Sequence, residues 1–258
     1  MEIIRSYIRN NIFYKRPTIM APENIDTLVL HSTGDAAPSA KNHVNYYNNE
    51  SVNVAVHAFI DGNTGDVHEA LPLNYKGAHA GSGGMNFHSI GVEMCEPDGF
   101  IYAGGATVWK VTNRSKCLET IKRTYESAVE YFAHLIVERG LNIKNIYGHG
   151  ELRRLGLSTT THVDPEHLWN YFGIGYTMNR FREEVWGLVE QKRGGKVEPV
   201  YNKLEDIPTA YRDTISKLID MGLLNGYNDG LGLTRDMCRI LTILNRGGLF
   251  DAIEKKDI

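Results

Sequence analysis

One segment near the middle of the chain carries the strongest periodic pattern and therefore limits the possible folds most. Between Ser115 and Arg139, large apolar side chains recur at steps of three and four positions, namely Leu118, Ile121, Tyr125, Val129, Phe132 and Ile136. This spacing places them on one face of an α-helix, and Gly140 stands where a helix stop is expected. We therefore expect one long core helix that packs along a sheet.

Segments before this helix have the patterns of β-strands. Thr27 to Leu30 is a continuous apolar run, which is typical of a buried strand. Val54 to Ile60 alternates between two faces, and a turn-forming sequence, DGNTGD, connects it to Val67 to Leu71. The two alternating segments are expected to pair as a hairpin.

A fourth strand is predicted from Ile90 to Cys95. Burial of its alternate residues Ile90, Val92 and Met94 directs Glu93 to the opposite face. Because strands precede the long helix and a further strand follows it, we predict an α/β fold with a mixed central β-sheet flanked by helices.

The composition limits the classes of partner. The chain has 258 residues, 42% of them hydrophobic, which suffices for one full-sized domain and a smaller one. Its net charge is -3 without a long basic run, so we expect no nucleic-acid partner and no binding to anionic membranes. No stretch approaches the ~20 apolar residues that span a bilayer, and no membrane insertion is expected.

Cysteine usage and the first residues favour synthesis in a reducing cytoplasm. The three cysteines, Cys95, Cys117 and Cys238, are widely spaced and odd in number, which argues against a disulfide framework. Charges at Glu2, Arg5 and Arg9 interrupt the first 16 residues, which lack the apolar core of a signal peptide.

The pattern changes near residue 190, and we expect a domain boundary there. Residues 191–200 have the composition of a linker between a domain at 1–190 and a small helical module at 201–258. Two amphipathic helices are expected in this module, marked by Tyr211, Ile215, Leu218 and Ile219 and by Met237, Ile240, Leu241 and Leu244. Such a short module is marginally stable alone, so wall binding, dimerisation or docking on the first domain are the alternatives.

Three polar side chains have the arrangement of a metal site. His31 and His149 each follow an apolar segment that gives way to a loop, and the sequence HVDP brings His162 and Asp164 to one side of an extended segment. Two imidazoles and a carboxylate leave a fourth position open on a tetrahedral zinc ion, as in catalytic zinc sites. An exposed loop that carries HVDP by chance is the alternative.

Six separated motifs together resemble a known family. They are LVLHSTG with His31, VAVHAFID with His57, GAHAG with His79, SIGVEM with Glu93, YGHGE with His149 and HVDPEHLW with Asp164. Their order and spacing resemble those of type 2 N-acetylmuramoyl-L-alanine amidases, which share their fold with peptidoglycan recognition proteins. The resemblance covers roughly Asp26 to Trp169, and it is strongest to endolysins of phages that infect Gram-positive, clostridium-like hosts.

The resemblance implies an activity and a set of residue roles. A relative of this kind is expected to use Zn²⁺, held by His31, His149 and Asp164, to hydrolyse the bond between N-acetylmuramic acid and L-alanine in peptidoglycan. Glu93 is the expected catalytic base, since Val56 stands where other members have a tyrosine. As an endolysin, the protein is expected to reach the cell wall after release through a lesion made by another protein.

Other roles are less directly tied to the motifs. His162 stands where many members have a lysine and is expected to stabilise the oxyanion; alternatively it binds zinc and leaves Asp164 outside the coordination sphere. His57 and His79 are expected at the substrate groove, with a core position as the alternative for His57. Gly81 to Gly84 and Gly99 to Thr112 are expected to be mobile groove loops. Glu96 and Glu151 are expected to be surface residues.

Three alternatives to the phage amidase stay open. A recognition module of the same fold binds muropeptides without cutting them, and it usually lacks the third metal ligand. A host autolysin would have the same chemistry. A generic metallopeptidase is the third, but the chain has no HExxH sequence.

Overall fold

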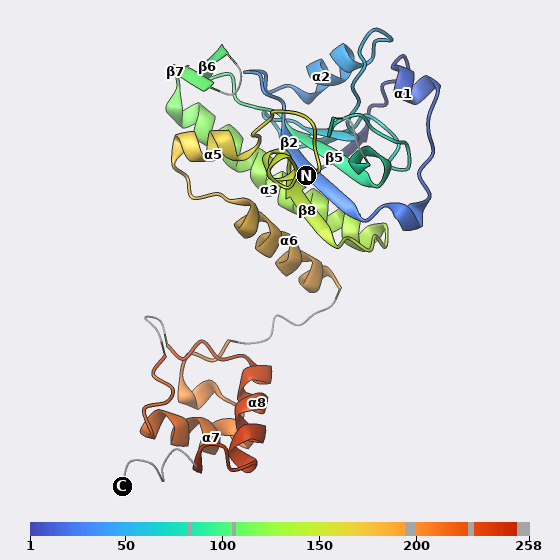
Figure 1. Ribbon diagram of the computed structural model, residues 1–258. Coiled ribbons are helices and arrows are strands. Elements are labelled where there is room, and N and C mark those ends of the chain that lie inside the picture. Colours follow the sequence, from blue (N-terminus) through green and yellow to red (C-terminus); the bar gives the residue numbers. More distant parts are fainter. Residues whose placement is uncertain (82–83, 105–106, 194–199, 227–229, 252–258) are drawn as a thin grey trace. The chain divides into compact units, whose positions relative to one another are not determined.

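The computed structural model describes residues 1–81, 84–104, 107–193, 200–226 and 230–251 (Figure 1). The chain divides into two compact units, Met1–Arg193 and Gly194–Ile258, and each is described by itself. Residues 194–199 of the expected linker and 227–229 of the expected turn between the last helices lie outside the described residues.

The first unit is built on a six-stranded mixed sheet with the order β1-β4-β3-β5-β2-β8. The strands are β1 (Ile3–Arg5), β2 (Thr27–Ser32), β3 (Ala58–Ile60), β4 (Val67–Glu69), β5 (Ser89–Met94) and β8 (Asn145–Gly148). Only the β3–β4 pair, which forms the predicted hairpin, is antiparallel. All six residues of the central strand β2 are buried, as is typical of a parallel strand with both faces covered. The predicted α/β fold with a mixed sheet is confirmed.

Helices lie on both sides of this sheet, and a two-stranded hairpin stands beside it. The helices of the first unit are α1 (Ile12–Lys15), α2 (Ala40–Tyr47), α3 (Arg114–Glu138), α4 (His149–Arg154), α5 (Glu166–Phe172) and α6 (Met178–Lys192). Short 3-10 turns occupy Pro22–Asn24 and Met85–Phe87, and the hairpin consists of β6 (Phe100–Gly104) and β7 (Thr107–Val111). The predicted long helix is confirmed as α3. It starts at a cap in which the Asn113 side chain accepts a hydrogen bond from Lys116 N at 3.0 Å.

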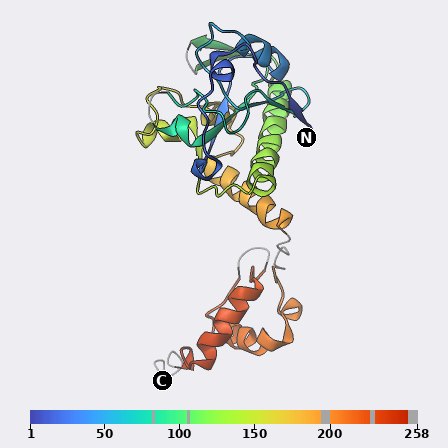
Figure 2. The ribbon, with the colours of Figure 1, turned by 90° about the vertical axis from the view of Figure 1, so that its right-hand side faces the viewer.

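The period-2 alternation of the central strands separates the core from the site. Leu28 and Leu30 of β2, and Ile90, Val92 and Met94 of β5, pack into the main core with the apolar sides of α3, α5 and α6. The long helix α3 lies along this face of the sheet (Figures 1 and 2). The intervening residues of both strands therefore point to the opposite face, where the polar cleft lies.

The segment from Gly99 to Thr112, expected as a mobile loop, is instead the β6–β7 hairpin within its described residues. Two buried side chains hold this hairpin in place. Phe100 and Val108 are buried in the main core, so packing fixes the hairpin against the rest of the unit. Gly81 and Gly84 of the other expected loop are described, whereas residues 82–83 are not.

The second unit contains a short turn at Leu204–Asp206 and the helices α7 (Thr209–Asp220) and α8 (Arg235–Arg246). Its core consists of Tyr201, Ile207, Ile215, Leu218, Leu233 and Cys238. The sequence pattern was expected to mark the buried face of α8, but Met237, Ile240 and Leu244 are 46%, 56% and 39% exposed. The buried residues of α8 are Cys238 and Thr242, so the face that the helix buries differs from the predicted one. In the described part of the chain, none of the helices is both long and apolar enough to cross a bilayer.

Candidate metal centre and active site

Three side chains from distant parts of the sequence meet at one end of the sheet. His31 lies near the end of β2, His149 is the first residue of α4, and Asp164 lies just before α5. β2 and β8 are parallel neighbours, so the residues at their carboxyl ends are brought together. The two Nδ1 atoms are 3.0 Å apart, and the Asp164 carboxylate lies 3.5 Å from Nδ1 of His31 and 3.4 Å from Nδ1 of His149.

These residues fit a metal ion. One ligand atom from each lies within 4.8 Å of the others, and all three side chains are buried. Three lone pairs that face one another at such distances repel unless a cation or a proton lies between them. The cluster contains Asp164 and excludes His162, whose side chain is 62% exposed with Nδ1 3.7 Å from the Asp164 carboxylate.

The electrostatics of the cluster favour the protonation states that bind metal. Burial, with the neighbouring His149, lowers the pKa of His31 to about 4, so its imidazole is neutral at physiological pH. Burial opposes ionisation of Asp164, but hydrogen bonds and Coulomb attraction from the two histidines hold its pKa below the ordinary range. Neutral imidazoles and an ionised carboxylate are the forms in which these side chains coordinate metals.

The second nitrogen of His31 is held by a chain of hydrogen bonds. With Nδ1 facing the cluster, Nε2 carries the hydrogen and donates it to Nδ1 of His79 at 3.0 Å. His79 Nε2 then faces Ser89 Oγ at 3.4 Å, and Ser89 donates to the carbonyl of Met85 at 2.6 Å. Donors and acceptors match along this chain in one direction only, which fixes the tautomer and the ring orientation of His31.

The second nitrogen of His149 is held by hydroxyl groups instead. Its Nε2 lies 2.6 Å from Thr160 Oγ1 and 3.3 Å from Ser158 Oγ. These two hydroxyl residues were not predicted from the sequence. The run STTT directly before the HVDP motif was the available signal, because hydroxyl side chains are common partners of metal-bound imidazoles.

A cleft of about 720 Å³ opens onto the cluster. Its lining includes all three cluster residues together with His79, Glu93 and His162. The cleft is therefore large enough for a ligand of several residues or sugar units and presents it to the metal site.

Comparison with known proteins identifies the family. The family model described as N-acetylmuramoyl-L-alanine amidase matches residues 21–167. The chain belongs to this family. The match includes the three cluster residues and the strand with Glu93.

Relatives of this amidase family member agree with the fold. The N-acetylmuramoyl-L-alanine amidase BlyA of Bacillus subtilis is 32% identical over 117 residues, which are 38% of this chain and 31% of that protein. The chain thus spans about a third of the length of this curated relative. The catalytic domain of XlyA superposes with a TM-score of 0.50 at 21% identity over 72% of this chain and 99% of that one. Staphylococcus aureus AmiA, solved with its ligand, superposes with a TM-score of 0.56 at 18% identity over 76% of this chain and 87% of that one.

Glu93 lies where the strand alternation predicted. It pairs in register with His31 across β2 and β5, and it lines the cleft. Burial, then the charges of Asp164 and Glu96, raise the pKa of Glu93 well above its ordinary value. Its Oε2 is buried without a hydrogen-bond partner among the described residues, so this oxygen is available to a ligand in the cleft.

His57 and His79 have different surroundings in the structure. His79 lines the cleft, as expected, and also contacts His31. His57 is 0% exposed, with Nε2 2.8 Å from the Tyr75 carbonyl and Nδ1 accepting from Gly91 N at 3.0 Å. Both ring nitrogens are thus occupied by the main chain. The expected substrate contact of His57 is therefore corrected to a core position, which was the alternative.

The expectation that Glu96 is a surface residue is wrong. Glu96 is 2% exposed and accepts hydrogen bonds from Ser32 Oγ and Tyr102 OH, both at 2.6 Å. The Tyr102 hydroxyl also lies 2.8 Å from Nε2 of His167, which lines the cleft. Since Ser32 follows His31 and donates its main-chain N–H to Asp164 at 3.2 Å, this buried network supports two of the cluster residues.

Proposed function

We propose that the unit formed by residues 1–193 hydrolyses the amide bond between N-acetylmuramic acid and L-alanine in bacterial peptidoglycan, with Zn²⁺ as its cofactor. The observation that carries the proposal is the buried cluster of His31, His149 and Asp164 at the floor of a cleft that also contains Glu93. Family membership supports the same reaction.

The donor set fits zinc in particular. Nitrogen and oxygen ligands bind Zn²⁺ at about 2.0–2.2 Å, and in a tetrahedral site such ligands lie about 3.3 Å apart. The separations of 3.0, 3.5 and 3.4 Å among the cluster atoms are close to this value. When bound, zinc would polarise the scissile carbonyl and lower the pKa of a water molecule.

The residues of the chain supply the proton transfers. We assign Glu93 as the group that accepts a proton from the attacking water and delivers it to the leaving nitrogen. A carboxyl with a raised pKa is suited to both tasks near neutral pH. Its position on β5, directly beside His31 on β2, keeps it within the same site.

We assign His162 to the oxyanion. It lines the cleft, and its ring centroid lies 4.7 Å from that of His149, so an N–H from this side chain can face the substrate carbonyl. His79 is assigned to hold His31 and to line the groove.

A measurement of zinc content combined with digestion of purified Gram-positive cell walls tests the proposal. We expect one equivalent of zinc, and newly freed muramic acid and L-alanine amino termini. Asp164→Ala should lose both, because two neutral imidazoles alone hold zinc weakly. Asp98→Ala is the matched control, since Asp98 is an exposed aspartate paired with Lys116.

Two results would each contradict one part of the proposal. Wild-type protein that binds walls without releasing amino termini would indicate a recognition module. Release of termini by Asp164→Ala at the wild-type rate would remove Asp164 from the proposed metal site.

We also propose a role as a phage endolysin, which rests on the motif resemblance to phage lysins. In this role the protein would be made in the host cytoplasm and would reach the wall only at lysis. For the unit 194–258 we propose wall binding or homodimerisation, and the exposed Met237, Ile240 and Leu244 on α8 support a contact there. Sedimentation of the full chain, with and without Ile240→Lys, distinguishes the dimer from the monomer.

A further inference from the structure

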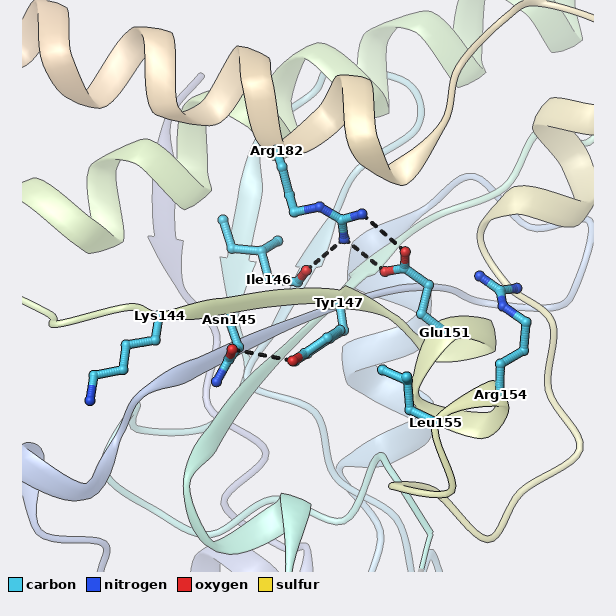
Figure 3. A pocket seen from close by; sticks show the side chains of 8 residues that line it. All are labelled: Lys144, Asn145, Ile146, Tyr147, Glu151, Arg154, Leu155 and Arg182. Atoms are coloured by element: carbon cyan, nitrogen blue, oxygen red, sulfur yellow. Dashed lines mark hydrogen bonds and ion pairs between the residues drawn. The ribbon is translucent and has the colours of Figure 1, made fainter.

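An arginine of α6 joins this helix to β8 and α4, the two elements that meet at His149. Arg182 Nη1 donates to the Ile146 carbonyl at 2.9 Å and to Glu151 Oε2 at 2.9 Å. Its Nη2 donates to Glu151 Oε1 at 3.1 Å and to Asn179 Oδ1 at 2.6 Å. Figure 3 shows Arg182 reaching from its helix toward both the strand carbonyl and the Glu151 carboxylate, at the wall of a pocket of about 300 Å³.

The Glu151 carboxylate that binds Arg182 also binds Gly148, the residue before His149. Gly148 precedes α4 and has no side chain with which to cap the helix, so its own N–H and the first N–H groups of the helix need other acceptors. Glu151 Oε2 accepts from Gly148 N at 3.0 Å. The surface role expected for Glu151 is therefore wrong: its side chain is only 16% exposed and is shared between Arg182 and the main chain.

Gly150, the residue after His149, is bound by the segment that contains Asp164. Gly150 N donates to the carbonyl of Asp164 at 3.0 Å, which ties the residue after His149 to Asp164 through the main chain. A side chain at Gly150 would meet the main chain of Val163 at 3.2 Å. His149 thus sits between one neighbour fixed by Glu151 and another fixed by the Asp164 segment.

We propose that Arg182 is a positioning residue of the metal site, acting through Glu151 and β8 to hold His149 in its coordinating orientation. β8 is the edge strand of the sheet, so on one side it has no strand partner to fix its end. An arginine is suited to this place because its planar group serves a carboxylate at two points and a carbonyl at the same time, which a lysine does not. The inference rests on the metal site proposed above.

Zinc affinity of the full chain, measured by competition with a chromophoric chelator, tests the role. Arg182→Met keeps the length and the apolar stem of the side chain, and we expect zinc to bind about 10- to 100-fold more weakly. Arg180→Met is the matched control, two residues away on the same helix. Its ion pair with Glu184 is exposed and touches neither β8 nor α4, so near wild-type affinity is expected.

A second variant tests the role without changing Arg182, and a second readout reports directly on the residue before His149. Glu151→Gln keeps an acceptor for Gly148 N but removes the charge that binds Arg182, and we expect an intermediate loss of affinity. In zinc-free protein, amide hydrogen exchange at Gly148 should quicken in Arg182→Met and stay unchanged in Arg180→Met.

Equal affinities of wild type, Arg182→Met and Glu151→Gln would overturn the positioning role while leaving the proposed metal site intact. Equal losses in Arg182→Met and Arg180→Met would overturn it as well, because a general effect on α6 would then explain both. Wild-type protein without measurable zinc affinity would instead overturn the proposed metal site, and the inference with it.

Discussion

Each histidine of the cluster has a neighbour in the chain that is bound by a carboxylate, but the two carboxylates have opposite surroundings. Glu96, which binds Ser32 beside His31, is almost fully buried and has no lysine or arginine within ion-pair distance among the described residues. Glu151, which binds Gly148 beside His149, is paired with Arg182.

This difference follows from the place of each strand in the sheet. β2 is central, with β5 and β8 on its two sides, whereas β8 is at the edge, where a long side chain from α6 reaches it. Burial without a cation raises the pKa of Glu96 to about 8. The central position thus gives a buried support that holds its proton at neutral pH, and the edge position gives one that is paired with an arginine.

The largest expected effect is the pH dependence of stability that the buried Glu96 causes. The folded-state pKa of Glu96 is about 8, above its ordinary value of 4.5, so the folded protein holds this proton more tightly than the unfolded chain. The stabilisation is present below pH 4.5 and is lost as the pH rises through 8. Relative to Glu96→Gln, the free energy of unfolding of the wild type should fall by up to about 1.4 kcal/mol per pH unit in this window.

Urea unfolding of both proteins in chelator, from pH 4 to 9, measures this difference. Subtracting the Glu96→Gln curve removes the contributions of other titrating groups such as His31. Parallel curves would mean that Glu96 is ionised throughout, as expected of a paired carboxylate. Bound zinc should reduce the difference between the wild-type and Glu96→Gln curves, because a nearby cation favours the ionised form of Glu96.

A smaller effect is expected from matched alanine substitutions at two glycines. A Cβ at Gly91 on β5 would lie 2.6 Å from the His79 ring, which is itself held by His31 and Ser89. We expect Gly91→Ala to cost about 1–3 kcal/mol of unfolding free energy, because this crowded core cannot move aside.

Gly148→Ala is the counterpart beside His149. Its Cβ would meet Met178 Cγ and Sδ at 3.1 Å and Pro165 Cδ at 3.2 Å. These contacts are longer than the 2.6 Å at Gly91, so we expect a smaller cost, below about 1 kcal/mol. Chemical denaturation of the two variants checks the order. Equal costs would contradict the view that the central side is the more rigid one.

The smallest expected difference is between variants that remove the partners of the two imidazoles. His79→Leu removes the acceptor of His31 Nε2, and we expect zinc to bind about 10- to 100-fold more weakly. Thr160→Val removes the closer acceptor of His149, but Ser158 Oγ at 3.3 Å remains, so a smaller loss is expected. Chelator competition measures both. A larger loss of zinc affinity in Thr160→Val than in His79→Leu would contradict this expectation.

Much of the fold was predictable from periodicity. The spacing of apolar residues predicted α3, and the alternation of Ile90, Val92 and Met94 predicted that Glu93 faces away from the core. The same reasoning was only partly right for α8, where Leu241 packs against the core but the other three apolar residues expected there are exposed and Cys238 is buried. A pattern shows that a helix has an apolar face, but it does not show which element covers that face.

Local sequence by itself determined strands β2 to β5, the long helix and the residue types of the cluster, because side-chain period and turn chemistry act over a few positions. Only the tertiary structure decided how these residues are supported. Glu96 and Glu151 both looked like surface carboxylates, yet one is enclosed by Ser32 and Tyr102 and the other is bound by Arg182. These partners lie from 6 to 64 residues away along the chain, and in the longer cases the strand order of the sheet and the packing of α6 bring them together.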